Sequence, residues 1–273
     1  MSNPEAPYVL GSAAAEQERL IRQATIFDPL TERLFRDAGI GPGQRVLDVG
    51  SGVGDVAMLA ARMVGSSGSV TCIERDPKSL SRARSRAAAA GLGNLSFIEG
   101  NVENVSSSEA FDAAVGRLVL EFVPNPAAVV RSLSALVRPL GVMAFQGVWP
   151  LSLLQLSAHL PLRAKCARLI ASTFERAGVP LDMELVLYRA MHDAGLLGPH
   201  MRLEVAIGDD PNIVRWLPDL FSALLPRMGR QDLVEAGIGQ LDTLESRLEA
   251  ERIAARSFAA CVGLASAWAR KPV

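Results

Sequence analysis

Residues 45–55, RVLDVGSGVGD, decide the fold of this chain. They begin with a compact apolar run that is typical of a β-strand buried on both faces. Three glycines follow at alternate positions, Gly50, Gly52 and Gly54, and residues 55–65 then have a helical composition that ends at a glycine. In such a strand–turn–helix unit the first glycine allows a tight turn, and the second lets the backbone approach a ligand closely.

The alternation of strand and helix continues toward the C-terminus. Further strands are predicted at residues 69–74, 95–100, 111–116 and 141–148. Helices between them are predicted to open at the capping pairs Asp76-Pro77 and Asn125-Pro126. Strands that alternate with helices of about 10 to 15 residues require parallel pairing with right-handed crossovers. The predicted fold class is therefore α/β, a Rossmann-like, doubly wound sheet.

The pattern differs on either side of this core. Residues 13–38 are predicted to form two short helices, because Asp28-Pro29 marks a break and a helix restart. After Trp149 the chain is mostly helical, with a sixth strand predicted at residues 200–208 and a seventh within 257–271. We expect a mostly parallel seven-stranded sheet with helical cap insertions above its carboxyl edge, where ligands bind in open α/β folds.

The composition excludes several classes of protein. Hydrophobic residues make up 49% of the 273 residues and charged residues 21%, so the chain can bury a sizeable core. The net charge is −1 and no block of Lys or Arg forms a basic face, which argues against a nucleic-acid partner. Three cysteines without metal-ligand spacing predict neither a disulfide framework nor a metal site.

Two segments bear on localisation. The N-terminus lacks a basic region followed by an apolar stretch, so we expect no signal peptide. Residues 139–162 carry no charge, but Pro150, Pro161 and several polar residues make them a poor membrane-spanning helix. We therefore expect a cytoplasmic protein with no membrane partner.

Two acidic residues distinguish between possible ligands of the glycine turn. A dinucleotide site requires a third glycine at position 55, where this chain has Asp55. A carboxylate there repels a pyrophosphate but tolerates the cationic amino-acid end of a sulfonium ligand, which disfavours a nicotinamide oxidoreductase. Glu74 ends the second strand, 24 residues after Gly50, where a carboxylate can bind both hydroxyls of a ribose.

Four segments between Arg45 and Gln146 resemble the class I S-adenosylmethionine-dependent methyltransferases, and within them the branch that acts on small molecules, including the ubiquinone and menaquinone biosynthesis type. They are VLDVGSGVGDVA (46–57), IERDP (73–77), EGNVENV (99–105) and the run from FDAAVG to GVMAF (111–145). The resemblance implies S-adenosylmethionine as cofactor and one catalytic domain. Its parts are an N-terminal helical segment (1–40), the cofactor-binding core (41–148), a helical cap with a return helix (149–197) and the last two strands with inserted helices (198–273).

The resemblance also implies which residues hold the methionine end of the cofactor. The turn residues that wrap it are Gly50, Ser51, Gly52 and Gly54. Asp48 is implied to hold the loop, although it is alternatively a buried carboxylate satisfied by loop amides. Arg117 and Leu118, just past the fourth strand, are implied to flank the methionine end, and Arg117 is alternatively a surface ion-pair partner.

At the adenosine end, the same resemblance implies that Glu74 binds the ribose and that Arg75 lies against the adenine. Asn101 and Val102 occupy the place where the family usually has Asp followed by a small or apolar residue. The Asn amide oxygen can still accept a hydrogen bond from the adenine amine. We therefore expect adenine recognition to survive this departure from the family pattern.

The sequence defines the methyl acceptor only by class. Residues 120–126, LEFVPNP, lack the adjacent prolines and the aromatic residue found at this place in enzymes that methylate DNA bases. We therefore expect transfer to an O, N or C nucleophile of a small molecule. The leucine-rich caps suit an apolar or aromatic one, although leucines also simply pack a core. The alternative is a protein that binds the cofactor without transferring methyl, either cyclase-like or regulatory.

No catalytic residue is assigned from the sequence. A hydroxyl acceptor of high pKa needs a general base that titrates near neutral pH. The residues considered for this role are His159, His192, His200 and Glu121. The acceptor atom and the oligomeric state stay open at this stage.

Overall fold

The computed structural model describes Leu10 and residues 14–273. The chain forms two compact units. Unit 2 consists of Phe27–Val148, Met183–Leu203 and Leu264–Val273. Unit 1 consists of the described residues of Met1–Ile26 together with Trp149–Asp182 and Glu204–Gly263. The glycine turn predicted from the sequence belongs to unit 2.

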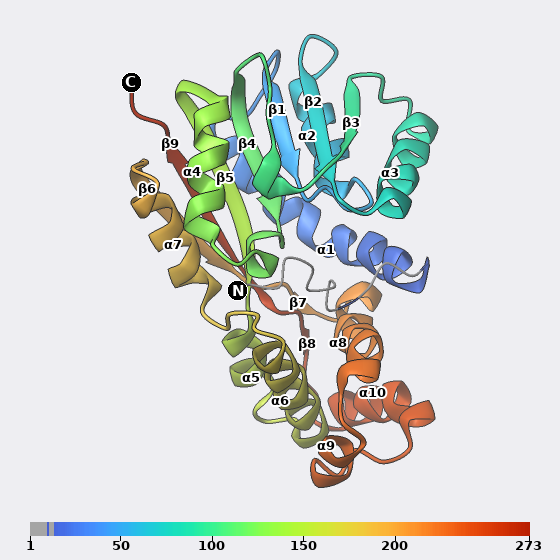
Figure 1. The fold of residues 1–273 in the computed structure, drawn as a ribbon. Helices are drawn as coiled ribbons and strands as arrows, with labels where there is room; N and C mark the ends of the chain where they lie inside the picture. The colour runs from blue at the N-terminus through green and yellow to red at the C-terminus, as the bar shows by residue number, and fades with distance from the viewer. Residues whose placement is uncertain (1–9, 11–13) are drawn as a thin grey trace. The chain divides into compact units, whose positions relative to one another are not determined.

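Unit 2 is built on a seven-stranded sheet (Figure 1). Its strands are β1 (Arg45–Val49), β2 (Ser69–Glu74), β3 (Leu95–Glu99), β4 (Phe111–Arg117), β5 (Val137–Trp149), β6 (Leu197–Glu204) and β9 (Gly263–Arg270). They lie in the order β3-β2-β1-β4-β5-β9-β6. Strands β1 to β5 pair in parallel with their neighbours. The predicted Rossmann-like, mostly parallel sheet is confirmed.

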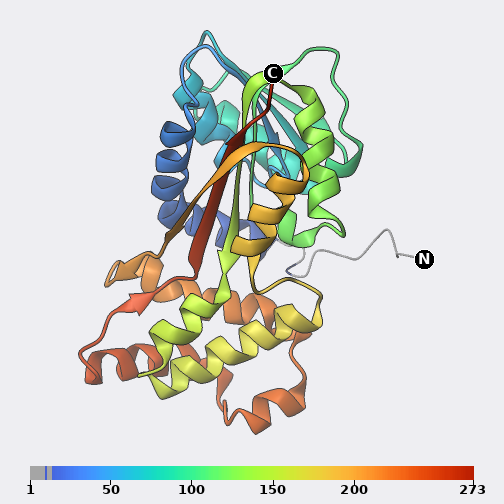
Figure 2. The ribbon, with the colours of Figure 1, turned by 90° about the vertical axis from the view of Figure 1, so that its left-hand side faces the viewer.

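The last strand, β9, runs antiparallel to β5. Leu140 N–H donates to the Lys271 carbonyl at 3.1 Å, and Lys271 N–H donates to the Gly141 carbonyl at 2.9 Å. Further along β5, Gln146 hydrogen-bonds Ser266, an earlier residue of β9. Partners that move in opposite directions along two strands define an antiparallel pair. Figure 2 shows β9, in dark red, between β5 and β6, and confirms that the final apolar run forms the seventh strand.

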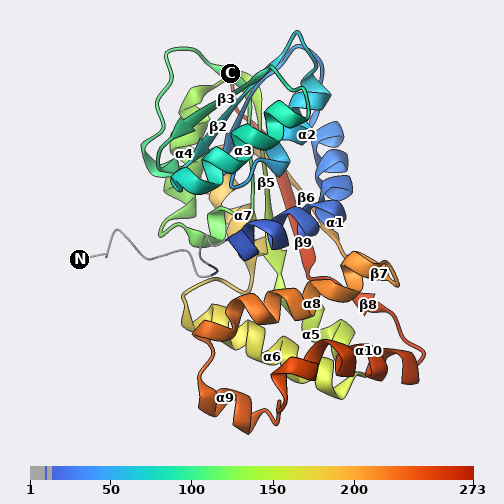
Figure 3. The ribbon, with the colours of Figure 1, turned by 90° about the vertical axis from the view of Figure 1, so that its right-hand side faces the viewer.

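Helices cover both faces of this sheet (Figure 3). They are α1 (Ala14–Ala38, in unit 2 from Phe27), α2 (Asp55–Val64), α3 (Pro77–Ala89), α4 (Pro126–Leu136), α7 (Met183–Asp193) and the 3-10 helices η1 (Val102–Asn104) and η2 (Leu120–Phe122). Val46 of β1 packs in one core cluster with Leu34 of α1. Its neighbour Leu47 packs in the other with Leu133 of α4. Strand β1 is therefore buried on both faces, as its apolar run predicts.

Unit 1 is mainly helical. Besides the first part of α1 it contains α5 (Pro150–Ser157), α6 (Pro161–Arg176), α8 (Pro211–Leu224), η3 (Leu225–Arg227), α9 (Arg230–Glu235), η4 (Leu241–Thr243), α10 (Leu244–Ala254) and the antiparallel pair β7 (Ile207–Gly208) and β8 (Ala259–Ala260). Helix α6 packs against α5 and α8. Several leucines expected to suit a substrate are instead buried in the core of this unit: Leu153, Leu160, Leu217 and Leu224.

The prediction of two short helices before residue 38 was wrong. Helix α1 runs unbroken from Ala14 to Ala38, with Pro29 inside it. Proline removes one helical hydrogen bond, but the residues on both sides of it, Phe27 and Leu30, are buried. We attribute the continuity of the helix to this burial, which outweighs the local cost of the proline.

The predicted sixth strand was displaced. Strand β6 begins at Leu197 and ends at Glu204, whereas residues 207 and 208 pair with β8. The Ala206 carbonyl already accepts from Cys261 N–H at 3.0 Å. The backbone partners of this stretch therefore lie in the β8 segment, a pairing that an apolar run alone does not specify.

No helix within the described part of the chain is long and apolar enough to cross a membrane. The uncharged run at residues 139–162 is divided between β5, α5 and the start of α6. Pro150 and Pro161 are the first residues of the two helices. Proline is tolerated at this position because the first helical N–H groups have no partner within the helix.

Candidate functional site

The glycine turn between β1 and α2 presents bare backbone. Gly50, Gly52 and Gly54 have φ of 65°, 52° and 89°, values that favour glycine. A Cβ on Gly50 would lie 2.5 Å from Val119 Cγ2, and one on Gly54 would lie 3.0 Å from the Cβ of Ala83. A Cβ on Gly52 would meet no described heavy atom within 4 Å. Packing thus requires glycine at position 50 and leaves a side chain at position 54 in tight contact with Ala83, while Gly52 borders open space.

A carboxyl group without partners is buried at the end of β1, next to this turn. Asp48 is 1% exposed, and among the described residues neither of its oxygens has a hydrogen-bond partner. The hydroxyl of Ser51 is likewise buried and unpartnered there. Burial raises the pKa of Asp48 to about 8, the positive charge of Arg117 opposes this shift, and the carboxylates of Glu74 and Asp55 add to it. Such groups are costly unless a donor or a cation from outside completes them.

Glu74 at the end of β2 is tied to the same turn. Its Oε2 accepts the Gly52 N–H and its Oε1 accepts the Asp76 N–H, both at 2.9 Å. An ionised carboxylate has about four acceptor positions. Glu74 therefore supports the turn and retains capacity for two further donors.

Asp55, the first residue of α2, is not a free carboxylate. Its Oδ1 lies 2.6 Å from Nη2 of Arg86 on α3. The same guanidinium donates through Nη1 to the Val53 carbonyl at 2.6 Å. The charge expected to repel a pyrophosphate is thus balanced by an arginine that the sequence reasoning did not single out. Nothing local marks Arg86 among the neighbouring arginines, because it lies 31 residues from its partner.

The predicted adenosine residues lie where β2 and β3 end. These neighbouring strands pair Glu74 with Glu99 in register. Arg75 is exposed directly after β2. After β3, Asn101 caps η1, its Oδ1 accepting the Glu103 N–H at 3.3 Å, and Val102 is buried. The amide oxygen of Asn101 keeps a second acceptor position.

Arg117 and Leu118 follow β4. Arg117 is almost buried, and its Nη1 lies 3.0 Å from Asp28 Oδ1 and 2.9 Å from Thr31 Oγ1. Thr31 in turn lies 2.7 Å from Oε1 of Gln146 on β5. Leu118 has a φ of 57°, an uncommon value for a residue other than glycine. Arg117 is thus an ion-pair partner, though a buried one, and it joins α1 to the end of β4.

A second buried acid, with one oxygen that lacks a partner among the described residues, lies on the β5 side of β4. Glu121 in η2 is 4% exposed, and its Oε1 accepts the Val148 N–H at 2.9 Å. Among the described residues its Oε2 has no partner. A Cβ on Gly147 would lie 3.4 Å from Oε1, so the carboxyl lies against the end of β5. Burial raises its pKa to about 7.

The three histidines that were considered as a general base, His159, His192 and His200, lie in surroundings different from those of Glu121. His159 is exposed in unit 1, with Nε2 lying 2.6 Å from Ser257 Oγ. His192 on α7 is exposed and pairs with Asp193. His200 on β6 stacks on Trp268 at 5.3 Å. Of the residues considered as a general base, Glu121 is therefore the buried one and the one with a pKa raised to near neutral.

Comparison with known proteins adds a family to this geometry. Residues 40–179, which are 140 of the 273, match the family described as "Methyltransferase domain". The chain is 38% identical over 130 residues to the ubiquinone biosynthesis O-methyltransferase of Paracidovorax citrulli, covering 45% of this chain and 53% of that protein. It is 33% identical over 119 residues to an uncharacterized protein of Mycobacterium tuberculosis, covering 43% and 42%. The chain thus spans about half the length, or less, of these curated relatives.

A solved structure extends the likeness beyond the matched core. The YcgJ protein from Bacillus subtilis has a TM-score of 0.59 to this chain, with 14% sequence identity. The match covers 89% of this chain and 98% of that one. At this identity the likeness shows the fold alone.

Proposed function

The chain belongs to the methyltransferase-domain family of class I S-adenosylmethionine-dependent proteins, and we propose that it transfers the methyl group of S-adenosylmethionine to a small molecule. One observation carries the proposal. A buried carboxyl, Asp48, has two oxygens without partners beside bare backbone at Gly52. This combination fits a ligand that brings positive charge and hydrogen-bond donors and needs room where a side chain would be.

The other residues of the edge fit the remaining parts of this cofactor. Glu74 has acceptor capacity for the two ribose hydroxyls, and its bonds to the turn hold it in place. Asn101 offers an acceptor for the adenine amine, with Arg75 and Val102 alongside it. Arg117 and Leu118 close the methionine end, together with the turn from Gly50 to Gly54.

Bound S-adenosylmethionine supplies an activated methyl group on a sulfonium. The protein's own work is then to align the acceptor and exclude water. In our proposal the cofactor extends from the ends of β3 and β2, across β1, to β4. The acceptor side is accordingly that of β4 and β5, where Glu121 lies. Its Oε2 would take the proton of an acceptor hydroxyl or amine while the acceptor atom bonds to the methyl carbon and the carbon–sulfur bond breaks.

We propose a small hydroxylated acceptor rather than a macromolecule. The relative from Paracidovorax citrulli is named an O-methyltransferase of ubiquinone biosynthesis. A carboxyl that titrates near neutral pH suits the deprotonation of a hydroxyl. The earlier expectation of an apolar acceptor is weaker, because many of the cap leucines are core residues of unit 1.

Calorimetry with matched glycine variants tests the cofactor site. Gly52 and Gly91 both have positive φ, 52° and 68°, and a Cβ on either would meet no described atom within 4 Å. Alanine must therefore adopt a left-handed backbone conformation at both positions, but only Gly52 lies in the turn between β1 and α2. Gly52→Ala should weaken S-adenosylmethionine and S-adenosylhomocysteine binding at least tenfold, and Gly91→Ala should leave it unchanged.

Two outcomes redirect the proposal. If the folded wild type binds neither ligand, the cofactor site is refuted. If it binds both but yields no S-adenosylhomocysteine with catechols, phenols and indoles as acceptors, a cofactor-binding protein without methyl transfer is favoured.

A further inference from the structure

The side chains of Asp48 and Arg117 belong to the same face of the sheet. Strands β1 and β4 pair in parallel with Asp48 opposite Val115, and Arg117 follows Val115 by two residues. Side chains two residues apart on a strand point to the same face. Val46, two residues before Asp48, shares a core cluster with Val115 and with Leu34 of α1. Helix α1 therefore covers the face on which both charged side chains lie.

A threonine of this helix holds the Arg117 guanidinium. The side chain of Arg117 is 7% exposed, and its Nη1 donates to Thr31 Oγ1 at 2.9 Å. Thr31 is itself 1% exposed, and its hydroxyl donates to Gln146 Oε1 at 2.7 Å. Gln146 Nε2 in turn donates to Ser266 Oγ at 2.9 Å, which holds the amide in place. Because the hydroxyl proton is directed at Gln146, a lone pair of Thr31 is left to accept from Arg117.

The charges around Asp48 make the place of this guanidinium important. Besides burial, the carboxylates of Glu74 at the end of β2 and Asp55 on α2 raise the pKa of Asp48. Arg86 of α3 pairs with Asp55 at 2.6 Å, so its charge is directed to that acid. The positive charge of Arg117 is the largest of the charges that act on Asp48, and it favours the ionised carboxylate.

The ion pair with Asp28 alone does not fix the guanidinium. Asp28 Oδ1 lies 3.0 Å from Arg117 Nη1, and burial raises the pKa of Asp28 although the charges of Arg117 and Arg62 oppose the rise. The Asp28 side chain is partly exposed, so its carboxylate can turn while it stays paired. Thr31 has no such freedom, because its β-branched side chain is buried and its hydroxyl also lies 3.0 Å from the Phe27 carbonyl of the same helix. The hydroxyl is thus the contact that fixes where the Arg117 charge lies.

We propose that Thr31 is a positioning residue of the cofactor site. It holds the Arg117 guanidinium on the face where Asp48 lies, so that Asp48 can carry the negative charge that meets the cofactor. The inference rests on the proposed function. Without the hydroxyl the guanidinium keeps Asp28 but loses its fixed place, and ionising Asp48 costs more. Affinity then falls at a pH where Asp48 must lose a proton on binding, and is unchanged at a pH where Asp48 is already ionised.

Calorimetry of Thr31→Val with S-adenosylhomocysteine at two pH values tests this role. Because the pKa of Asp48 is about 8, a further rise of about half a unit should weaken binding about threefold at pH 7 and hardly at all at pH 9. The ratio of wild-type to variant affinity cancels the titration of the ligand itself. Thr31→Ser keeps the hydroxyl and should bind as wild type does at both pH values.

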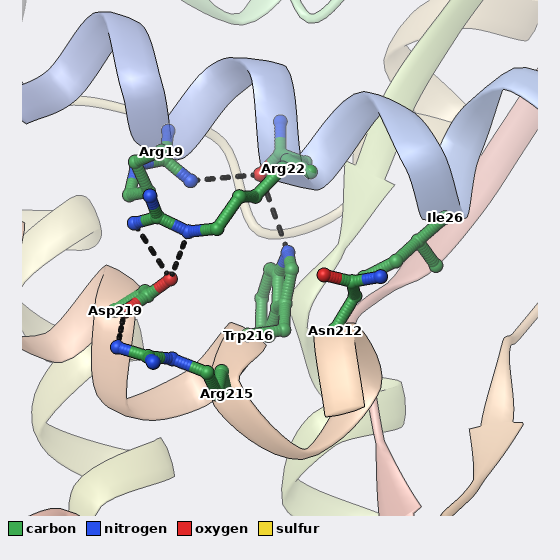
Figure 4. Close-up of a pocket in the computed structure, with 8 residues that line it drawn as sticks. Arg19, Arg22, Ile26, Asn212, Arg215, Trp216 and Asp219 are labelled. Atoms are coloured by element: carbon green, nitrogen blue, oxygen red, sulfur yellow. Dashed lines mark hydrogen bonds and ion pairs between the residues drawn. The ribbon is translucent and has the colours of Figure 1, made fainter. Parts of the chain in front are cut away.

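Two control variants separate this effect from a general loosening of the fold. Like Thr31, Thr173 of α6 is buried, donates to the carbonyl four residues earlier, at 2.7 Å, and contacts an arginine, since Arg176 Nη2 lies 3.4 Å from its Oγ1. Arg22→Gln breaks an ion pair of α1 itself, because Arg22 Nε donates to Asp219 Oδ2 at 2.9 Å (Figure 4). Thr173→Val and Arg22→Gln should each leave the affinity unchanged at both pH values.

The proposal is overturned if Thr31→Val binds as tightly as wild type at pH 7, or if it binds more weakly by the same factor at both pH values. The second result would leave Thr31 a structural role alone. Arg117→Gln removes the charge itself and is a second variant, whose loss of affinity must also shrink between pH 7 and pH 9. If wild type binds neither S-adenosylhomocysteine nor S-adenosylmethionine, the proposed function fails, and this inference fails with it.

Discussion

Replacing Asp48 by asparagine should stabilise the protein while weakening its affinity for the cofactor. Burial raises the pKa of Asp48 from 3.8 to about 8. The folded chain therefore keeps a proton that the unfolded chain releases between about pH 4 and pH 8, and stability falls as pH rises through that window. Each pKa unit corresponds to about 1.4 kcal/mol, so at pH 7 the cost is about 4 kcal/mol. Asparagine has nearly the shape of the protonated acid and does not titrate.

Denaturant unfolding from pH 4 to pH 8 measures this effect. The advantage of Asp48→Asn over wild type should be near zero at pH 4 and grow by about 1.4 kcal/mol per pH unit. Asp112→Asn is a control of opposite sign. Although partial burial of Asp112 opposes them, hydrogen bonds from Arg45 N–H and Arg138 lower its pKa. That variant should be less stable than wild type by an amount that grows as pH rises toward about 4 and then stays constant from pH 4 to pH 8.

Calorimetry supplies the second half of the test. At pH 7 the cofactor's positive charge should ionise Asp48, so binding should release close to one proton, seen as a dependence of the binding heat on the buffer's ionisation enthalpy. The variant should bind more weakly and release none. Suppose instead that Asp48→Asn is less stable than wild type at pH 8, or that its advantage does not change with pH. The carboxyl then has partners in solution, and our reasoning about a ligand-ready acid is refuted.

Three further outcomes are expected. Glu121→Gln should lower methyl transfer and abolish the rise in rate through about pH 7 that is expected of wild type, since a carboxyl of raised pKa acts as a base only above that pH. Thr31→Val should remove the hydroxyl that contacts Gln146 Oε1 and one of the two acceptors that Arg117 contacts, and so lower the free energy of unfolding by about 1–3 kcal/mol in denaturant titrations. Gly50→Ala should lower the melting temperature, because its Cβ would lie 2.5 Å from Val119. Adding Val119→Ala should restore part of that loss but not the strain at positive φ.

Much of the sheet could be predicted because its signals are local. Strands β1 to β5 follow from apolar runs, and the starts of α3 and α4 follow from Asp76 and Asn125, each of which accepts the N–H three residues on. The continuity of α1 through Pro29 and the early end of β6 could not be predicted in this way. Both depend on what the segment packs against or pairs with elsewhere in the chain.

The candidate site also has features that the sequence predicts and features that it does not. The positions of Asp48, Glu74 and the glycines are determined by where strands end, which the sequence makes visible. The residues that contact them cannot be predicted from the sequence in this way. Thr31 meets Gln146 across 115 residues of sequence, and nothing near either residue indicates the other. The surroundings that set each acid's charge therefore became visible only with the fold.

Those surroundings give the two buried acids, Asp48 and Glu121, different roles. Asp48 interacts with the charges of Arg117, Glu74 and Asp55, which suits a group that meets a charged ligand. Burial raises the pKa of Glu121, and only backbone hydrogen bonds oppose this rise, without a contribution from a charged side chain. Such surroundings suit a group that exchanges a proton. Both proposed roles require the ionised form, whereas the folded state favours the neutral form of each. Methyl transfer should therefore increase between about pH 6 and pH 8, over the range in which these two acids make the fold less stable. A pH profile in which activity and melting temperature rise together would contradict this assignment of the two acids.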